Sequence, residues 1–325
     1  MKIAFLTEMN NSGKVDLKHR NMRTEFAWMH ALSADQYQIS QYNTVNDYDH
    51  VFIIFPKGQL NLNAVAVKLI NTPNPHSNLL NSNWLSVLKQ QNKKIYFVQE
   101  GPTWMFTELE IQDQFNFYNM LASVDAIYAH NQYDMKFYRG IIPTQNVRLM
   151  PTLMIEDLLH DITPTKEDKV LIGGNFARWY NGFQSYLVAS EFDVPIWTQE
   201  SHAKREHEDR VPNLNHLPRL LWDQWMKEVS TFKYAIHLMP TIAAGTFSLN
   251  CAYFGIPCIG NEKVDTQRLC HPDLCVDVDD IETARSLAIA LRDNPGFYEK
   301  CSIEAKKNYR HFYDIKQWKN LINLK

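Results

Sequence analysis

Two adjacent glycines, followed by polar residues, stand directly after an apolar run in the second half of the chain. The run spans residues 169–172, and Gly173, Gly174, Asn175 and Arg178 come after it. Glycine lets the backbone approach a ligand closely, amides can donate to phosphate oxygens, and a guanidinium suits a diphosphate. The spacing lacks the GxGxxG pattern of dinucleotide-binding proteins. The segment therefore indicates either a phosphate-binding loop or a tight turn with a surface arginine.

A turn of small residues further along leads from another apolar run into a helical pattern. The run spans residues 233–239, and Gly245, Thr246, Ser248 and Asn250 lie in the segment that follows. A helix N-terminus attracts anions through its amides and its dipole, and hydroxyl groups add donors. The segment predicts an anion site, with ordinary N-capping by Thr246 as the alternative.

One carboxylate in the first half stands where a catalytic base could act. Glu100 follows the apolar run 94–99 and precedes Gly101 and Pro102. A carboxylate at the end of a strand can take a proton from an attacking hydroxyl group. The alternatives are a solvated loop glutamate and a helix cap.

A basic segment follows the first apolar run of the chain. Residues 10–23 hold four basic residues and one acidic residue, Asp16, so the local net charge is +3. Such a patch can hold an anionic acceptor or a phosphate backbone, and the alternative is a solvated loop. The four basic residues are Lys14, Lys18, Arg20 and Arg23.

These segments belong to a regular alternation of short apolar runs and helical patterns. That alternation is typical of βαβ units with a mainly parallel sheet, in which ligands bind at the carboxyl ends of the strands. The polar segment 161–168 interrupts it and predicts a linker. We expect two Rossmann-like α/β domains, at residues 1–162 and 163–325, and a helical tail from residue 280. The expected strands are residues 2–7, 50–55, 94–99, 124–129, 146–151, 169–172, 194–198, 233–239 and 257–260.

Composition limits the remaining classes of protein. The 325 residues are 45% hydrophobic and 21% charged, with a net charge of −3, which argues against a protein that coats nucleic acid over its whole surface. Five cysteines without a leader segment predict reduced thiols in the cytoplasm. Cys270, His271 and Cys275 match no zinc spacing, so no metal site is expected. No apolar stretch approaches the roughly 18 residues of a membrane span.

The order of these segments resembles the GT-B glycosyltransferases, and among them the DNA β-glucosyltransferases of T-even phages. The likeness is carried by the opening residues 1–4, by residues 45–49, by residues 94–96 leading to Glu100, by residues 173–178 and by residues 216–218. Where that family has a glutamate for the ribose hydroxyls, this chain offers Ser248, Asn250 or Cys251.

The resemblance implies a fold and a reaction. Two facing domains would enclose a cleft, and the second domain would bind a UDP-sugar. The uracil base would lie near Leu217, and the diphosphate would lie at residues 173–178 and 246–248. Glu100 would deprotonate the acceptor, and a hexosyl or pentosyl group would move with inversion; retention is the alternative if Glu100 lies too far away. The basic segment would contact double-stranded DNA that bears a hydroxymethylated base, in the host cytoplasm. No cofactor is obligatory, and Mg²⁺ or Mn²⁺ at the diphosphate stays open.

Two other functions remain open. The first is a GT-B enzyme acting on a surface glycan or a small molecule, which the sequence pI of about 6.5 favours. The second is a UDP-sugar 2-epimerase-like enzyme, for which Glu100, Glu200 and His237 are the available cleft residues. Transfer of the sugar without isomerisation would separate these two functions.

Overall fold

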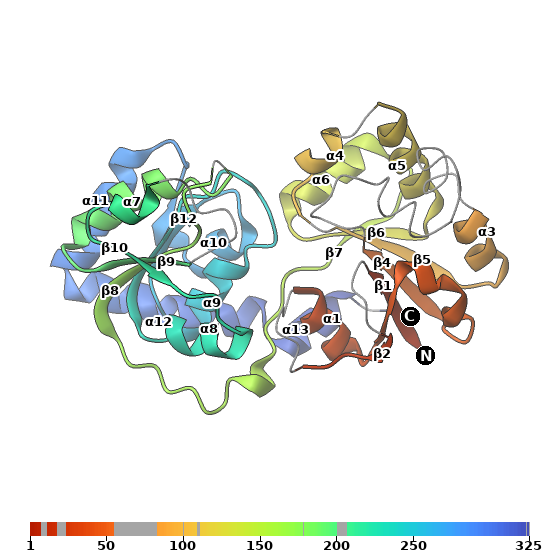
Figure 1. Ribbon diagram of the computed structural model, residues 1–325, viewed down its shortest axis with the longest axis horizontal. Coiled ribbons are helices and arrows are strands. Elements are labelled where there is room, and N and C mark those ends of the chain that lie inside the picture. Colours follow the sequence, from red (N-terminus) through yellow and green to blue (C-terminus); the bar gives the residue numbers. More distant parts are fainter. Residues whose placement is uncertain are drawn as a thin grey trace. The chain divides into compact units, whose positions relative to one another are not determined.

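The chain forms two compact units (Figure 1). The structure is a computed structural model that describes the 325 residues except 8–11, 18–23, 55–82, 100, 109–110, 178, 200–206, 323 and 325. The first unit comprises Met1–Lys18, Glu25–Pro151 and Leu321–Lys325, and the second comprises His19–Thr24 and Thr152–Asn320.

The first unit is built on a seven-stranded sheet in the order β2-β3-β1-β4-β5-β6-β7. Neighbouring strands are parallel except β2 and β3, which are antiparallel. Apolar runs form the central strands because both of their faces are covered. The strands are β1 (Ile3–Thr7), β2 (Ser12–Lys14), β3 (Asp35–Gln38), β4 (His50–Ile54), β5 (Lys94–Val98), β6 (Ala126–Ala129) and β7 (Val147–Leu149).

The two faces of this sheet have different cores. On one face Leu6 and Phe97 pack with Leu121 and Tyr138 from two covering helices. The other face carries an aromatic layer, in which Phe52 lies with its ring centroid 4.7 Å from that of Phe5 and 4.7 Å from that of Tyr96. The helices are α1 (Thr24–Leu32), α3 (Asn83–Gln90), α4 (Trp104–Thr107), α5 (Ile111–Ser123) and α6 (Gln132–Ile141), with the 3-10 turn η1 (Ile39–Val45).

The second unit has a six-stranded sheet in the order β10-β9-β8-β11-β12-β13, and all its strands are parallel. Its first strand, β8, lies beside its fourth, β11, so the winding of the chain reverses between these two strands. Such a switch point leaves a crevice outside the carboxyl ends of the strands. The strands are β8 (Glu167–Ile172), β9 (Ile196–Gln199), β10 (Leu214–Leu217), β11 (Phe232–His237), β12 (Cys258–Asn261) and β13 (Cys275–Val276).

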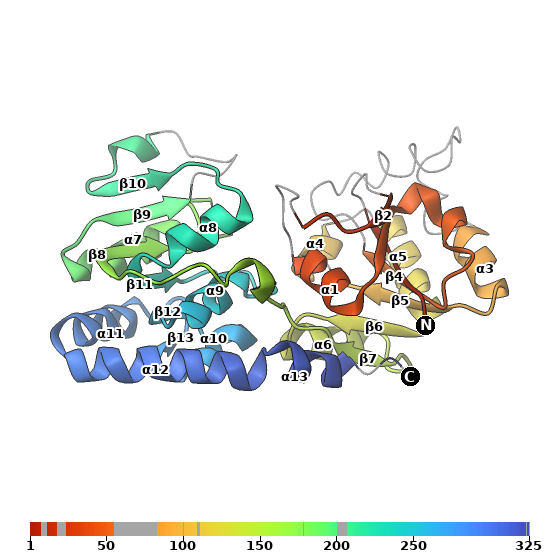
Figure 2. The same cartoon turned by 90° about the horizontal axis from the view of Figure 1, so that it is seen from below.

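Helices cover both faces of the second sheet (Figure 1). Helices α8, α9 and α12 pack on the face that carries Leu171 and Ala235, and α7 and α11 pack on the face that carries Val170 and Ile236. Helix α12 lies against α9 and α10 (Figure 2). The helices are α7 (Gly182–Ala189), α8 (Trp222–Val229), α9 (Thr246–Phe254), α10 (Asp265–Cys270), α11 (Ile281–Asp293), α12 (Pro295–Phe312) and α13 (Ile315–Ile322); the 3-10 turns are η2 (Glu156–Leu158), η3 (Ser190–Phe192), η4 (Glu208–Arg210) and η5 (Pro272–Leu274).

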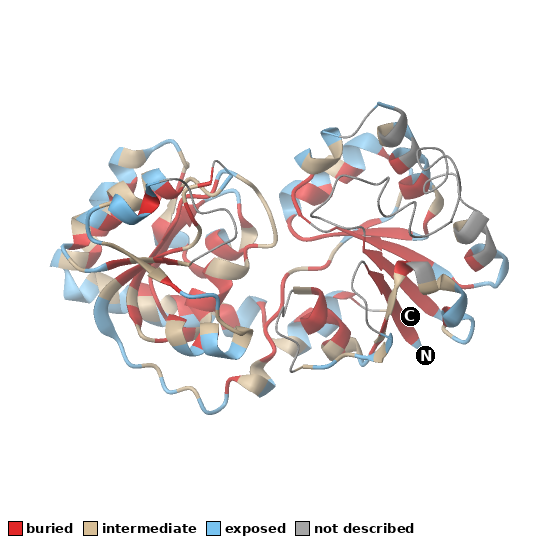
Figure 3. Ribbon diagram, viewed as in Figure 1, coloured by how far each residue is buried: buried red, intermediate tan, exposed pale blue. Residues whose placement is uncertain are grey.

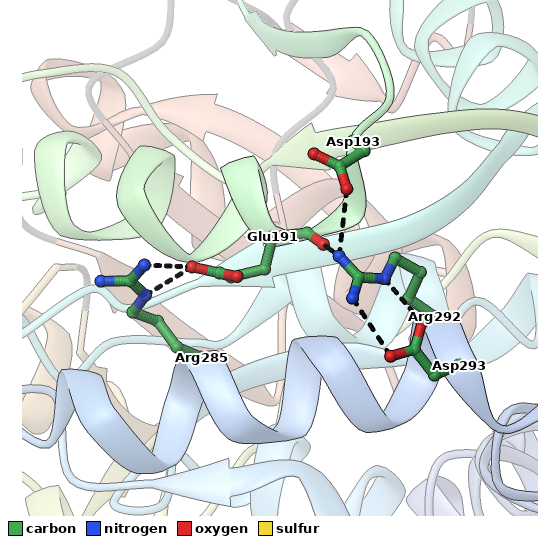
Figure 4. A network of polar contacts seen from close by, with 5 residues as sticks. All are labelled: Glu191, Asp193, Arg285, Arg292 and Asp293. Atoms are coloured by element: carbon green, nitrogen blue, oxygen red, sulfur yellow. Dashed lines mark hydrogen bonds and ion pairs between the residues drawn. The ribbon is translucent and has the colours of Figure 1, made fainter.

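A group of charged residues connects α11 to the turn after α7 (Figure 4). The Nε atom of Arg285 donates to Glu191 Oε1 at 2.6 Å, and Nη1 of Arg292 donates to Asp193 Oδ2 at 3.1 Å. Arg285 and Asp193 are exposed, so the ion pairs that they form at the surface contribute little. The buried contacts of α11, through Ala284, Ala288 and Leu291, fix it on the sheet.

The expected α/β architecture with terminal helices is confirmed, and the central strands of both sheets are buried (Figure 3). The change of unit falls between Pro151 and Thr152, ahead of the boundary expected at residue 162. The reason is packing, because Met154 and Leu159 lie in the core of the second unit. The polar segment 161–168 therefore lies within that unit.

Candidate functional site

Three elements of the second unit converge at its switch point. Gly173 follows β8, and its amide donates to the carbonyl of Ile236 in β11 at 2.8 Å. A Cβ atom at Gly173 would lie 2.5 Å from Cδ1 of Phe247 in α9 and 2.7 Å from Cδ2 of His237 in β11. Glycine is therefore required here because the end of β8 packs directly on two rings.

The loop after Gly173 folds back on itself. Thr198 donates to the carbonyl of Gly174 at 2.5 Å, and the buried side chain of Asn175 accepts from the amide of Ala177 at 3.0 Å. The Asn175 side chain thus fixes the loop, an Asx-type role. Arg178, the residue expected to meet a diphosphate, lies outside the described residues.

Helix α9 begins at the other side of the switch point. Its N-cap is Gly245, with φ of 71°, so no side-chain hydrogen bond caps the helix. Thr246 is the first helical residue rather than the cap. Amide donors in an uncapped first turn and the helix dipole both favour an anion there.

The turn before α9 is held by a neighbouring helix. The hydroxyl of Thr266, in α10, donates to the carbonyl of Gly245 at 2.8 Å and lies 2.7 Å from the hydroxyl of Ser248. A Cβ atom at position 245 would lie 2.0 Å from that same Thr266 oxygen. Ser248 and Asn250 are buried, so Ser248 serves the turn itself, and sequence reasoning did not identify Thr266.

A histidine at the end of β11 completes the cluster. His237 is 8% exposed, and its ring centroid lies 5.0 Å from that of Phe247. Burial lowers the pKa of His237 to about 4, so the ring is neutral near pH 7. The sequence analysis named His237 only for an epimerase. The signal that could have found it is a polar residue ending an apolar strand at the carboxyl edge.

Leu217, which was expected near the uracil of the donor, is the last residue of the edge strand β10 and is buried. Beside it, Nε2 of His216 lies 3.0 Å from Oε1 of the buried Glu208. This contact fixes the edge strand to η4.

Less of the expected acceptor site is described. Glu100, the basic residues Lys18, Arg20 and Arg23, and Glu200 all lie outside the described residues. Lys14 is exposed at the end of β2. Next to position 100, Gln99 is buried and donates to the carbonyl of Gly101 at 2.8 Å.

Within the part of the chain that the structure describes, no group of three or more His, Cys, Asp and Glu residues could hold a metal ion. The cysteines Cys251, Cys258, Cys270, Cys275 and Cys301 are free thiols. Burial raises the pKa of the Cys275 thiol to about 12, so that thiol is protonated near neutral pH. No helix among the described residues is long and apolar enough to span a bilayer.

The fold is that of the GT-B glycosyltransferases. A comparison with known protein families finds no match, and a comparison with curated proteins finds none either. Solved structures do match. Anabaena HepE in complex with UDP has a TM-score of 0.66 at 9% identity, with 99% of this chain and 98% of that chain covered. An α-glucosyltransferase of phage T4, with UDP and a 13-mer DNA containing an HMU base, has a TM-score of 0.61 at 12% identity and 99% coverage of both chains.

A third similar structure is longer than this chain. A point mutant of S. aureus TarM, in complex with UDP, has a TM-score of 0.60 at 10% identity. The match covers 89% of this chain and 60% of the TarM chain. At these identities the likeness concerns the fold.

Proposed function

We propose that this protein is a glycosyltransferase that takes its sugar from a UDP-sugar. The observation that carries the proposal is the convergence of Gly173, His237 and the uncapped start of α9 at the switch point of the second sheet. Donors from backbone amides and a helix dipole suit a diphosphate. The fold is shared with proteins solved with UDP bound, which supports UDP as the nucleotide.

The proposed donor site uses residues from several loops. Gly173, Gly174 and the first turn of α9, with Thr246, hold the diphosphate. Asn175 shapes the glycine loop, and Ser248 and Asn250 are buried residues of α9. Arg178 adds positive charge, and the uracil lies near Leu217. These groups stabilise the charge that develops on the leaving diphosphate.

The proposed reaction is an in-line displacement with inversion. The acceptor hydroxyl oxygen forms a bond to the anomeric carbon while the bond from that carbon to the diphosphate oxygen breaks. Glu100 takes the hydroxyl proton, and UDP leaves with the bonding electron pair.

A direct test begins with the donor. The purified full chain is incubated with UDP-glucose, UDP-N-acetylglucosamine and GDP-mannose, and sugar release is followed by mass spectrometry. We expect release from a UDP-sugar, without isomerisation of the sugar. Glu100→Gln should abolish turnover and leave UDP affinity unchanged, with Glu108→Gln, an exposed glutamate nearby in sequence, as the control. Full turnover in Glu100→Gln would remove Glu100 from the mechanism.

For the acceptor, we propose duplex DNA that bears a hydroxymethylated base, contacted by Lys14, Lys18, Arg20 and Arg23. The fold shared with a DNA-bound α-glucosyltransferase supports this proposal. DNA binding should weaken steeply as the salt concentration rises. Removing one of these four charges should lower the slope of log K against log salt concentration by about one. Absence of binding at low salt would contradict it.

A glycan or small-molecule acceptor is the second candidate. The sequence pI of about 6.5 favours it, and so does the fold shared with a TarM structure that contains α-GlcNAc-glycerol and UDP. An experiment that offers modified DNA and oligosaccharides together, with the active UDP-sugar, will decide between the two acceptor classes. The mass of the product identifies which acceptor gained a sugar.

A further inference from the structure

A polar side chain without a protein partner lies at the switch point of the second sheet. His237 is more than nine-tenths buried, and in the described part of the chain its ring contacts Phe247 and its ring nitrogens make no hydrogen bond. Buried ring nitrogens nearly always have a partner. A buried ring nitrogen without a hydrogen-bond partner, at the carboxyl edge of the sheet, therefore needs an explanation.

His237 is less enclosed than another buried histidine of the same unit. His237 is 8% exposed, whereas His271 is 2% exposed and its Nδ1 atom is fully enclosed and unpaired. The His237 side chain is held by packing against Phe247 and the backbone of Gly173, and part of its surface stays exposed at the carboxyl end of β11.

The surroundings of His237 favour an anion as that ligand. Phe247, which contacts the ring, belongs to the uncapped first turn of α9, where the dipole and the amides attract negative charge. A neutral imidazole has one N–H donor, and phosphate oxygens only accept. Donor and acceptor therefore match.

We propose that His237 binds phosphate: a ring N–H donates a hydrogen bond to an oxygen of the nucleoside diphosphate that lies between Gly173 and the start of α9. The inference rests on the proposed function, since it deepens the description of the same donor site. The proposed function places His237 at the switch point, and the further inference assigns the ligand group that the ring contacts.

The experiment compares UDP with uridine on the full chain. His237→Phe keeps a ring but removes the donor, and His237→Gln keeps an N–H group. Tyr234→Phe is the matched control, because Tyr234 is a buried aromatic residue of the same strand that stacks on Phe192. Binding is measured by calorimetry for UDP and by ligand-observed NMR for uridine, and a melting curve of each variant reports folding.

We expect His237→Phe to weaken UDP binding about tenfold or more, the loss typical of a hydrogen bond to a charged group. Uridine affinity should not change, His237→Gln should recover part of the loss, and Tyr234→Phe should bind UDP like the parent. In the parent protein, the ring 15N signals of His237 should shift with UDP and not with uridine, a measurement that does not depend on any variant folding.

Three results would overturn the inference. Equal UDP affinity in His237→Phe and the parent, or an equal loss for uridine and UDP, removes the phosphate contact. A loss seen with the UDP-sugar and not with UDP assigns His237 to the sugar instead. If the parent binds no UDP at all, the proposed function fails and the inference fails with it, a result that differs from the other three.

Discussion

Gly173 is needed for space rather than for backbone freedom. The sequence predicted a close approach of the backbone to a ligand, and a Cβ atom there would lie 2.5 Å from the ring of Phe247 and 2.7 Å from that of His237. Gly140, at an exposed position in α6, has nothing within 4 Å of the same hypothetical atom. The two glycines therefore predict opposite responses to one substitution.

Gly173→Ala should destabilise the protein by about 1–3 kcal/mol, as overpacking of a filled site does. It should also weaken UDP binding, because Phe247 and His237 must move. Gly140→Ala should instead be neutral or stabilise by up to about 1 kcal/mol, since alanine is the better helix residue. Urea unfolding of both variants checks this pair, and a Gly173→Ala variant as stable as Gly140→Ala would contradict the packing argument.

Buried histidine makes the second unit sensitive to acid. His271 is 2% exposed, its Nε2 lies 3.0 Å from the carbonyl of Ser248, and burial lowers its pKa to about 4 from the usual 6.5. Between these two values the unfolded chain binds a proton that the folded chain does not, so unfolding becomes easier as pH falls. The stability is fully present above pH 6.5 and is lost toward pH 4.

We expect each such histidine to steepen the pH dependence by up to about 1.4 kcal/mol per pH unit in that window. His237 adds the same trend, because its pKa is also about 4. His271→Gln should flatten the dependence measured by urea unfolding between pH 7 and pH 5, and the exposed His160→Gln should not. Parallel curves for His271→Gln and the parent would rule out a neutral buried His271.

At the scale of elements, the start of α9 depends on α10. Thr266 supports the carbonyl of Gly245 and the hydroxyl of Ser248, so it positions the first turn without itself facing a ligand. Such support from a residue distant in sequence fixes a binding loop more firmly than local turn chemistry alone.

Thr266→Val keeps the shape of the side chain and removes the hydroxyl. We expect a loss of about 1–3 kcal/mol in stability, because Gly245 and Ser248 lose a buried partner, together with weaker UDP binding. Thr283→Val, at an exposed position of α11, is the matched control and should leave both unchanged. Calorimetry with UDP separates the two effects: unaltered UDP affinity in a destabilised Thr266→Val would show that UDP binding does not depend on the support from α10.

Apolar runs in the sequence predicted most of the strands, but the strands that are rich in polar residues were not predicted. Asp35–Gln38 forms β3 although only one residue in it is apolar, because Gln36 is buried through a hydrogen bond to Thr7 at 2.8 Å. Leu214–Leu217 forms the edge strand β10 with mostly half-exposed side chains. Neither segment carries the alternation or the apolar run that marks a strand. Both form strands because of their contacts with the rest of the unit, which a local pattern does not contain.

The candidate site was predictable where local chemistry marks it. The sequence marks Gly173, Gly174 and Gly245 as candidates because glycine after a strand is a local signal. The sequence did not mark His237 and Thr266 as members of the proposed donor site, because the roles proposed for them depend on which strands are neighbours and on which polar atoms have partners. Those facts come from topology and packing and are absent from any short segment.

At the scale of the molecule, each unit has its own sheet of mainly parallel strands and its own core. The residues proposed for the diphosphate all belong to the second unit, whereas Glu100 and Lys14 belong to the first. Nucleotide binding and turnover should therefore be separable, and substitutions in the first unit should reduce turnover without reducing UDP affinity.

The last prediction follows from that division. A ligand that binds the folded state stabilises it by RT ln(1 + [L]/Kd), about 2.7 kcal/mol at a hundredfold excess over Kd. UDP should therefore raise the melting temperature of the full chain. Hydrogen exchange should slow at Gly173, Gly174 and the first turn of α9, and stay unchanged in the strands of the first sheet, which do not belong to the proposed nucleotide site. Protection confined to the first unit would place the nucleotide elsewhere, because amides that hold a diphosphate exchange more slowly only when that diphosphate lies against them.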